Sequence, residues 1–226
     1  MKKNAKKVIL TVLAVVLVFG CGVGATLAWL QDTTTPVVNT FTEGKVDIDL
    51  FEHQYDSTNN TLNNTEIRGD ATVDGDEGNS YKMIPGAVLP KDPTVVVKGG
   101  SEACWLFVKI EKANAVDTFL TYSIDASVWT PLIDANSDGV ADDGVYYKGI
   151  ITYTANDTPY NVLTGKQVTV KTSVKMSDMT GLSASNYPKL TFTAYAIQSA
   201  NLTDTNGDNI VDAADAWAAL NPPAAG

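Results

Sequence analysis

The strongest constraint on the fold of this chain is a two-residue alternation of apolar and polar side chains. In the stretch KVDIDL, Val46, Ile48 and Leu50 alternate with two aspartates. Successive side chains of an extended strand point to opposite faces, so the pattern predicts a strand with one buried face. Further β-rich runs are PTVVVK (93–98), CWLFVKIEK (104–112), VYYKGIITYT (145–154), KQVTVKTSVKM (166–176) and KLTFTAYAIQ (189–198).

Gly, Pro, Asn and Asp fill the gaps between these runs, as turns require. Many short strands with turn-rich connections predict an all-β fold, an antiparallel jelly-roll β-sandwich with long loops. The chain has 226 residues, of which 44% are hydrophobic, so it can bury a sizeable core. We assign the sandwich domain to residues 45–226.

One run, CWLFVKI, is apolar on both faces. Trp105 and Phe107 lie on one face, and the even-numbered residues Cys104, Leu106, Val108 and Ile110 form the other. Such a strand is either central and covered twice, or partly covered by another chain. We expect coverage within the same chain, with Cys104 as a buried, inert thiol.

Two segments depart from the strand pattern. Residues 55–80 are polar and dominated by Asn, Asp, Thr and Gly, which predicts a long surface insertion rather than a strand. The run DAADAWAAL (212–220) predicts a short C-terminal helix. Its Trp217 and Leu220 provide one apolar edge, and we expect Trp217 to pack onto the sandwich.

The N-terminus is typical of a secretory signal peptide. Four lysines precede an apolar region from Val8 to Phe19, and small residues then lead to a cleavage site between Ala28 and Trp29. We therefore assign residues 1–28 to a signal peptide. Two alternatives stay open: an uncleaved anchor, because the uncharged stretch is long enough to span a bilayer, and lipidation at Cys21.

The charge of the chain excludes a nucleic-acid-binding function. The first 28 residues hold four of the sixteen basic residues and no acidic one, so the remainder carries 26 acidic side chains against 12 basic ones. A surface this acidic repels nucleic acid and attracts divalent cations.

The segment 204–215, DTNGDNIVDAAD, has the spacing of a calcium-binding loop. Its candidate ligands are the side chains of Asp204, Asn206, Asp208, Asp212 and Asp215 and the backbone carbonyl of Ile210. Position 6, which favours a left-handed backbone, is Asn209, and the loop runs directly into the predicted helix. The alternative is a solvated Asp/Asn turn with Asp212 as the helix N-cap.

A second Asp-rich loop, residues 134–145, lies between SVWTPLI and VYYKGIITYT, which we predict to be paired strands. Its candidate ligands are the side chains of Asp134, Asn136, Asp138 and Asp142 and the carbonyl of Val140. Position 12 is Val145, so the closing acid is missing, although Asp143 is close by. An acidic hairpin loop without metal is the alternative. Calcium at either loop would be structural.

No catalytic motif is visible in the sequence. The chain lacks HExxH, GxSxG and phosphate-loop patterns, and His53 is its one histidine. A zinc site needs a cluster of ligand side chains, and a cysteine nucleophile needs a histidine base beside it. The sequence therefore predicts a non-catalytic protein.

The run GATLAWLQDTTTPVVNTFTEGKVDIDL resembles the start of the TasA/camelysin family. The matching positions are Ala28, Trp29, Asp32, Thr33, Asn39, Thr40, Phe41, Gly44 and the alternating strand to Leu50. The stretches YKMIPGAVLPKDPTVVVKGGSEACWLFVKIE and AYAIQSANL…AWAAL resemble clostridial-type members, so the resemblance covers most of the chain.

The resemblance implies export from a Gram-positive cell after cleavage by a dedicated signal peptidase. It also implies a jelly-roll subunit of biofilm-matrix fibres, in which the N-terminal segment of one subunit adds a strand to the next. Here that donor is the segment 29–44, with Val37, Val38 and Phe41 as the pocket-filling side chains. The alternative is that the segment folds back as the first strand of its own domain.

Two further resemblances are weaker. The loop 204–215 resembles a dockerin half-repeat, but dockerins bind cohesins through two such repeats, and this chain has one. The camelysin branch carries an annotation as a metallo-endopeptidase, for which this chain lacks a ligand cluster. The sequence thus predicts a secreted structural subunit of matrix or surface fibres; the alternative is a cell-surface binding or adhesin module for cell-wall or matrix components.

Overall fold

The computed structural model describes residues 44–68, 78–133 and 143–220, all within one unit that spans Glu43–Gly226. The predicted signal peptide, nearly all of the predicted donor segment and most of the loop 134–145 lie outside the described residues. No helix in the described part of the chain is long and apolar enough to cross a membrane.

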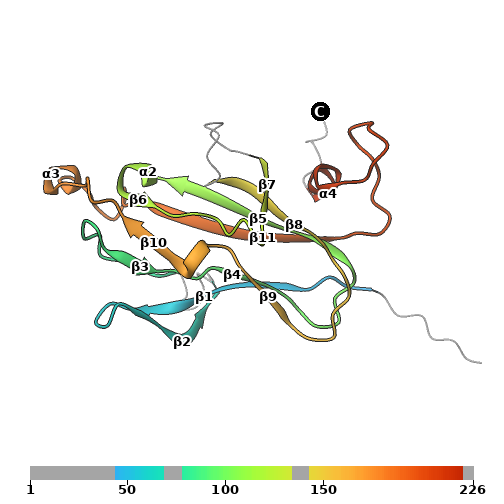
Figure 1. Cartoon of the computed structure of the whole chain (residues 1–226), viewed down its shortest axis with the longest axis horizontal. Coiled ribbons are helices and arrows are strands. Elements are labelled where there is room, and N and C mark those ends of the chain that lie inside the picture. Colours follow the sequence, from blue (N-terminus) through green and yellow to red (C-terminus); the bar gives the residue numbers. More distant parts are fainter. Residues whose placement is uncertain (1–43, 69–77, 134–142, 221–226) are drawn as a thin grey trace, which may run out of the picture. The chain divides into compact units, whose positions relative to one another are not determined.

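The described residues form an all-β structure of three antiparallel sheets, and Figure 1 shows the two larger sheets as facing layers. The first is ordered β11 (Lys189–Gln198), β5 (Cys104–Ala113), β8 (Gly144–Ile151), β7 (Thr130–Ile133). The second is ordered β2 (Thr61–Ile67), β1 (Ile48–Asp56), β4 (Thr94–Val97), β9 (Thr158–Asn161). The third is ordered β3 (Val88–Pro90), β10 (Gln167–Val170), β6 (Leu120–Thr121).

Four helical turns complete the described structure: α2 (Val116–Phe119), η1 (Thr164–Lys166), α3 (Met176–Met179) and α4 (Ala213–Leu220). The predicted C-terminal helix is confirmed as α4. The short turns α2, η1 and α3 carry no apolar periodicity that the sequence would reveal.

The main core fills the space between the two four-stranded sheets. Leu106 and Val108 of β5 face Val95 and Val97 of β4 across it, and all four are essentially inaccessible to solvent. Trp129 is buried in the same core, and its indole N–H donates to the carbonyl of Asn161 at 2.8 Å. The partner satisfies the polar atom that burial of a tryptophan brings into the core.

The second face of β5 is covered by α4. The ring of Trp217 lies 5.3 Å from that of Phe107 and 5.2 Å from that of Tyr195 on β11. Phe107 is completely buried as a result. The prediction that β5 is covered on both faces within its own chain is confirmed, as is the packing of Trp217 on the sheet.

Most of the predicted strands are confirmed, but several boundaries differ: β1 begins at Ile48 and β8 ends at Ile151. The run 166–176 forms a strand only to Val170, because the chain then turns, with the amide of Val174 donating to the carbonyl of Lys171 at 3.2 Å. The expectation that residues 55–80 contain no strand is wrong. β1 continues to Asp56, and β2 pairs with it as a hairpin.

The hairpin escaped prediction because β2 buries almost nothing. Of its residues only Ile67 is buried, and most of the others are exposed. Backbone pairing therefore holds the strand in place without an apolar face, and an alternation of apolar and polar residues has no cause to appear.

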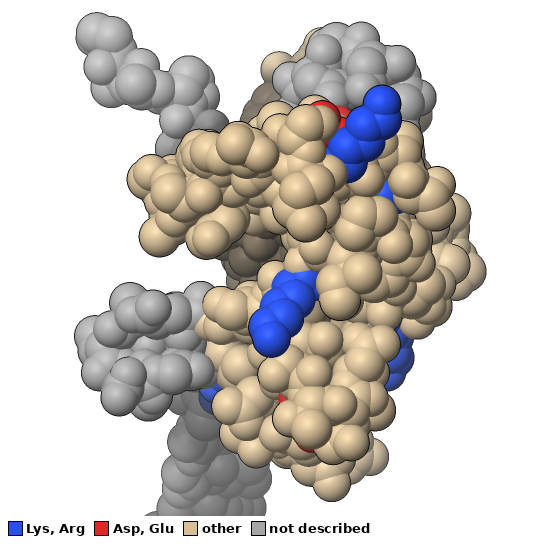
Figure 2. Space-filling model, turned by 90° about the vertical axis from the view of Figure 1, so that its left-hand side faces the viewer, with Lys and Arg blue, Asp and Glu red and all other residues tan. Residues whose placement is uncertain are grey.

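A smaller core lies under the third sheet. It consists of Leu89, Phe119, Val170 and Val174. Figure 2 looks onto the end of the structure where α3 and β3 lie, and its surface is mostly uncharged, with scattered Lys and Arg side chains. Ile84 and Met176, the flanking apolar side chains, are 61% and 81% exposed.

Candidate functional site

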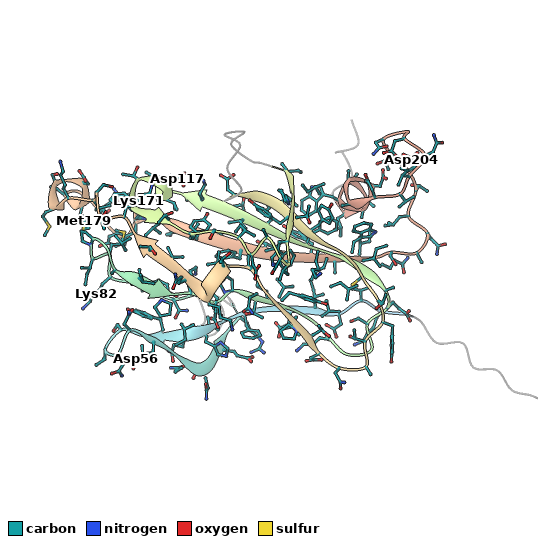
Figure 3. The ribbon with its side chains drawn as sticks, viewed as in Figure 1. Asp56, Lys82, Asp117, Lys171, Met179 and Asp204 are labelled. Atoms are coloured by element: carbon teal, nitrogen blue, oxygen red, sulfur yellow. The ribbon has the colours of Figure 1, made fainter. Side chains whose placement is uncertain are left out.

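The predicted calcium loop 204–215 is folded around its first aspartate. One carboxylate oxygen of Asp204 accepts hydrogen bonds from the amides of Asn206 and Gly207, at 3.1 and 2.7 Å. The other oxygen accepts from the amide of Asn209 at 2.8 Å. Figure 3 places Asp204 at the opposite end of the described structure from Lys82 and Met179.

The backbone at Asn209 has φ of 65°, which confirms the prediction of a left-handed residue at position 6 of the loop. Asparagine tolerates this region better than other residues with a side chain. The chain therefore reverses direction at the point where a calcium loop does.

The end of the loop is joined to α4 by two aspartates. The carboxylate of Asp212 accepts from the amides of Ala214 and Asp215, at 2.8 and 3.2 Å, and so caps the helix. Asp215 is buried and turns back into the loop, where it accepts from the amide and hydroxyl of Thr205, both at 2.6 Å, and from the amide of Asp212 at 3.1 Å. The hydrogen bonds from Thr205 hold the pKa of Asp215 below its ordinary value.

The loop offers only oxygen ligands, the kind that calcium prefers. Asn206 and Asp208 each accept an amide hydrogen bond from two residues further on, at 2.9 and 2.8 Å, and both side chains are exposed. In the described residues, no three His, Cys, Asp or Glu side chains gather as a metal group. The four aspartates of the predicted ligand set therefore do not converge on one point, and the Asp212 cap is the feature expected of the alternative, a solvated turn. Calcium binding stays a prediction.

The second predicted calcium loop cannot be located in the same way. Asp134, Asn136, Asp138, Val140 and Asp142 lie outside the described residues. The strands that flank them pair as predicted, with Thr130 opposite Tyr147 and Ile133 opposite Val145.

Asp143, at the described end of that loop, is buried beside Lys112, whose ammonium lies 3.4 Å from one carboxylate oxygen. The other carboxylate oxygen has no hydrogen-bond partner among the described residues. The Lys112 side chain is itself nearly buried. The positive charge beside Asp143 offsets the cost of burying its carboxylate.

The sheet edges differ sharply in how they are protected. A proline lies in each of the edge strands β3, β7 and β9, namely Pro90, Pro131 and Pro159, and β6 is two residues long. The pairing of β2 is interrupted by a register shift between His53 and Tyr55. Each of these features hinders pairing with a further strand.

The edge strand β11 has none of these features. It pairs with β5 in unbroken register over all ten of its residues and contains no proline. It is the last strand of its sheet, and no described strand pairs with its outer edge. A long, regular edge of this kind presents a row of free backbone donors and acceptors.

The inner face of β11 is also incompletely covered. Four of its apolar side chains face the main core but are only half-buried, namely Leu190, Phe192, Ala194 and Ala196. The nearby residues Ile48 and Leu50 of β1 are half-buried too, and no described strand pairs with this half of β1 on the side away from β4. The core is therefore least covered where β11 forms its edge.

The residues predicted to act in assembly, Val37, Val38 and Phe41, and the cleavage site between Ala28 and Trp29 lie outside the described residues. Sequence reasoning did not identify the acceptor side of that prediction. No proline pattern in the sequence marked it, because KLTFTAYAIQ directly follows Pro188, and CWLFVKIEK, VYYKGIITYT and KQVTVKTSVKM contain no proline either.

His53 and Cys104 lie in surroundings that give them structural roles. Nδ1 of His53 lies 2.7 Å from the carboxylate of Asp92, which is buried and also accepts the His53 amide at 2.9 Å. Cys104 is a buried free thiol, as predicted, and burial raises its pKa. A thiol in this state is a poor nucleophile.

Comparisons of the chain with protein-family models, with curated proteins and with solved structures found no match. The likeness to the TasA/camelysin family therefore stays a prediction.

The first prediction concerns calcium. We expect 1 mM calcium to raise the melting midpoint relative to EDTA by about 1 to 5 °C, because extracellular calcium loops with Kd of about 0.1 to 1 mM stabilise by about 0.4 to 1.4 kcal/mol. Asp208→Ala should reduce this shift through loop 204–215, and Asp138→Ala is the matched change in loop 134–145. Identical midpoints of the unmodified chain in calcium and EDTA would rule out both sites.

The second prediction concerns pH. Because the folded pKa of Asp215 is lowered, its carboxylate stabilises the fold above the ordinary pKa of 3.8, and this stabilisation disappears as pH falls through the lower folded value. In EDTA, Asp215→Asn should therefore be less stable than the unmodified chain at pH 7. The difference, measured by urea unfolding, should shrink below pH of about 4. A difference that is constant from pH 7 to 3 would contradict this role.

Proposed function

We propose that this chain is a secreted, non-catalytic structural subunit of extracellular matrix or surface fibres. In this proposal the domain is a jelly-roll sandwich, and subunits join head to tail when the N-terminal segment of one adds a strand to the next. The observation that supports it best is the long outer edge of β11, which lies near β1 but pairs with no described strand, above a half-covered part of the core.

Strand addition would pair the outward backbone groups of β11 and would also cover its half-buried side chains. An extended segment beside β11 supplies partners for its outward backbone groups, and its alternate side chains cover the half-buried Leu190 and Phe192. Completing the burial of such side chains contributes about 1 kcal/mol each. An edge left free in a secreted protein would instead be prone to unspecific pairing.

The segment 29–44 has the length that this role requires. Its 16 residues reach about 50 Å when extended, whereas the ten residues of β11 span about 33 Å. Val37, Val38 and Phe41 provide the apolar side chains. The described structure begins at Gly44, four residues before β1, so the segment is attached to the sheet that faces β11.

Calcium has a structural part in this proposal. The loop 204–215 leads into α4, and α4 packs through Trp217 on Tyr195 of β11. A metal ion that stiffens the loop would thus stabilise the layer behind the acceptor edge. Beyond its own copies, the chain would meet the signal peptidase during export and cell-wall or matrix components outside the cell.

The same edge would also suit an adhesin, since it can accept an extended segment of a different protein. This alternative differs from the fibre subunit in one respect: an adhesin stays monomeric when pure.

The third prediction tests assembly. A chain that lacks residues 29–42 should stay monomeric in analytical ultracentrifugation, whereas the chain that starts at Trp29 should form oligomers. A synthetic peptide of residues 29–44, added to the truncated chain, should slow amide hydrogen exchange in β11, because its outward amides gain partners.

The edge strand β2 is the internal control for this exchange experiment, and its amides should not change. Ala194→Glu, which places a charge on the half-buried inner face of β11, should weaken the peptide's effect, whereas Asn63→Glu on the exposed β2 should not. Protection of β2 rather than β11 would contradict the proposed acceptor. A chain from Trp29 that stays monomeric would favour the adhesin.

A further inference from the structure

A lysine, a glutamate and an asparagine from three separate segments meet beside β1. The ammonium of Lys91 lies 2.7 and 2.9 Å from the two carboxylate oxygens of Glu52 on β1. The second of these oxygens also accepts from the side-chain amide of Asn79, at 3.4 Å. One carboxylate oxygen therefore contacts both an amine and a carboxamide.

The side chains of this group are shielded from solvent. Those of Lys91 and Glu52 are only 12% and 16% exposed. The ammonium lies over two aromatic rings, 5.6 Å from the centre of Tyr81 and 5.3 Å from that of Phe192. Excluding water from an amine and a carboxamide strengthens the electrostatic contacts between them and hinders hydrolysis.

Asn79 is held in a fixed orientation by the backbone of β1. Its side-chain oxygen accepts from the amide of Tyr55 at 2.7 Å, and its nitrogen donates to the carbonyl of His53 at 2.9 Å. The amide of Tyr55 thus points at the oxygen on which negative charge would develop if a nucleophile attacked the carboxamide carbon. A backbone N–H in this position is the elementary unit of an oxyanion hole.

We propose that Lys91 and Asn79 form an intramolecular amide bond, with Glu52 as the proton carrier. Glu52 takes a proton from the Lys91 ammonium, and the neutral amine attacks the carboxamide carbon of Asn79 to form the Nζ–Cγ bond. Glu52 then passes this proton to the Asn79 nitrogen, and the Cγ–Nδ2 bond breaks. One ammonia leaves, a second proton from Nζ passes to Glu52, which ends protonated, and Nζ keeps its third proton as the amide hydrogen, so no oxidant or other reactant is needed.

The bond would close a covalent ring from Asn79 to Lys91, which includes β3 and the side chains of Tyr81 and Met83 under the third sheet. Cross-linking a chain stabilises it mainly by restricting its unfolded state. Burial raises the pKa of the Tyr81 phenol, so it stays protonated next to the reacting groups.

Intact-mass spectrometry of the purified chain, whose N-terminus has been sequenced, tests the proposal. We expect a mass below that of the sequence by one ammonia molecule. Trypsin should then release a branched product that joins the peptide ending at Lys82 to the peptide 83–98, which stays uncut at Lys91. Neither result depends on whether the chain forms fibres.

Three variants assign the chemistry. Lys91→Arg keeps the positive charge but offers no nucleophilic amine, Glu52→Gln keeps the size of the side chain but cannot carry the proton, and Asn79→Ala removes the carboxamide. Each should have the full mass of its sequence, while Asn63→Ala on the exposed β2 should keep the loss. Circular dichroism shows whether each variant is folded.

Two results would overturn the proposal. One is a folded, unmodified chain at its full sequence mass, which would make Lys91 and Glu52 an ordinary ion pair. The other is an equal loss of ammonia in the unmodified chain and in Lys91→Arg, which would show that the loss does not come from a bond between Lys91 and Asn79.

Discussion

Coverage of β5 on both faces is the constraint on which the rest of the structure depends. The even-numbered side chains of β5 fill the core between the two large sheets, and Phe107 on its other face lies under α4. A strand buried twice must lie inside its sheet, so β11 and β8 flank it. The helix α4 is then needed to cover the Phe107 face of β5. The Asp-rich loop 204–215 leads into α4 and fixes the residue at which the helix begins.

The same arrangement leaves one side of the core unfinished. β11 pairs with β5 along its whole length but has no described partner beyond, and its inner side chains stay half-buried. The other exposed strands carry a proline, a register shift or very few residues. In this chain the other edge strands are protected against further pairing, whereas the long edge strand β11 is regular. A protein that accepts an additional strand has these features. This contrast links the architecture to the proposed assembly.

The local sequence pattern predicted where most strands lie, but it did not predict the order of the strands in the sheets. KLTFTAYAIQ is a strand over all the residues predicted, and the left-handed Asn209 was expected from its place in the loop. β2 was missed because an exposed strand needs no apolar alternation, and the order of strands in each sheet depends on contacts between distant residues. The group of Lys91, Glu52 and Asn79 was invisible for the same reason, since the three residues are brought together only by the tertiary fold.

Negative-stain electron microscopy of the chain that starts at Trp29, incubated with calcium and with EDTA, tests the central claim most directly. The account predicts filaments in calcium. Filaments that persist in EDTA would show that calcium at the Asp-rich loops affects only local stability. Filaments that disappear in EDTA would show that assembly requires calcium. Isolated particles in both solutions would contradict the account, because a chain with both the donor segment and the open β11 edge would then have failed to assemble.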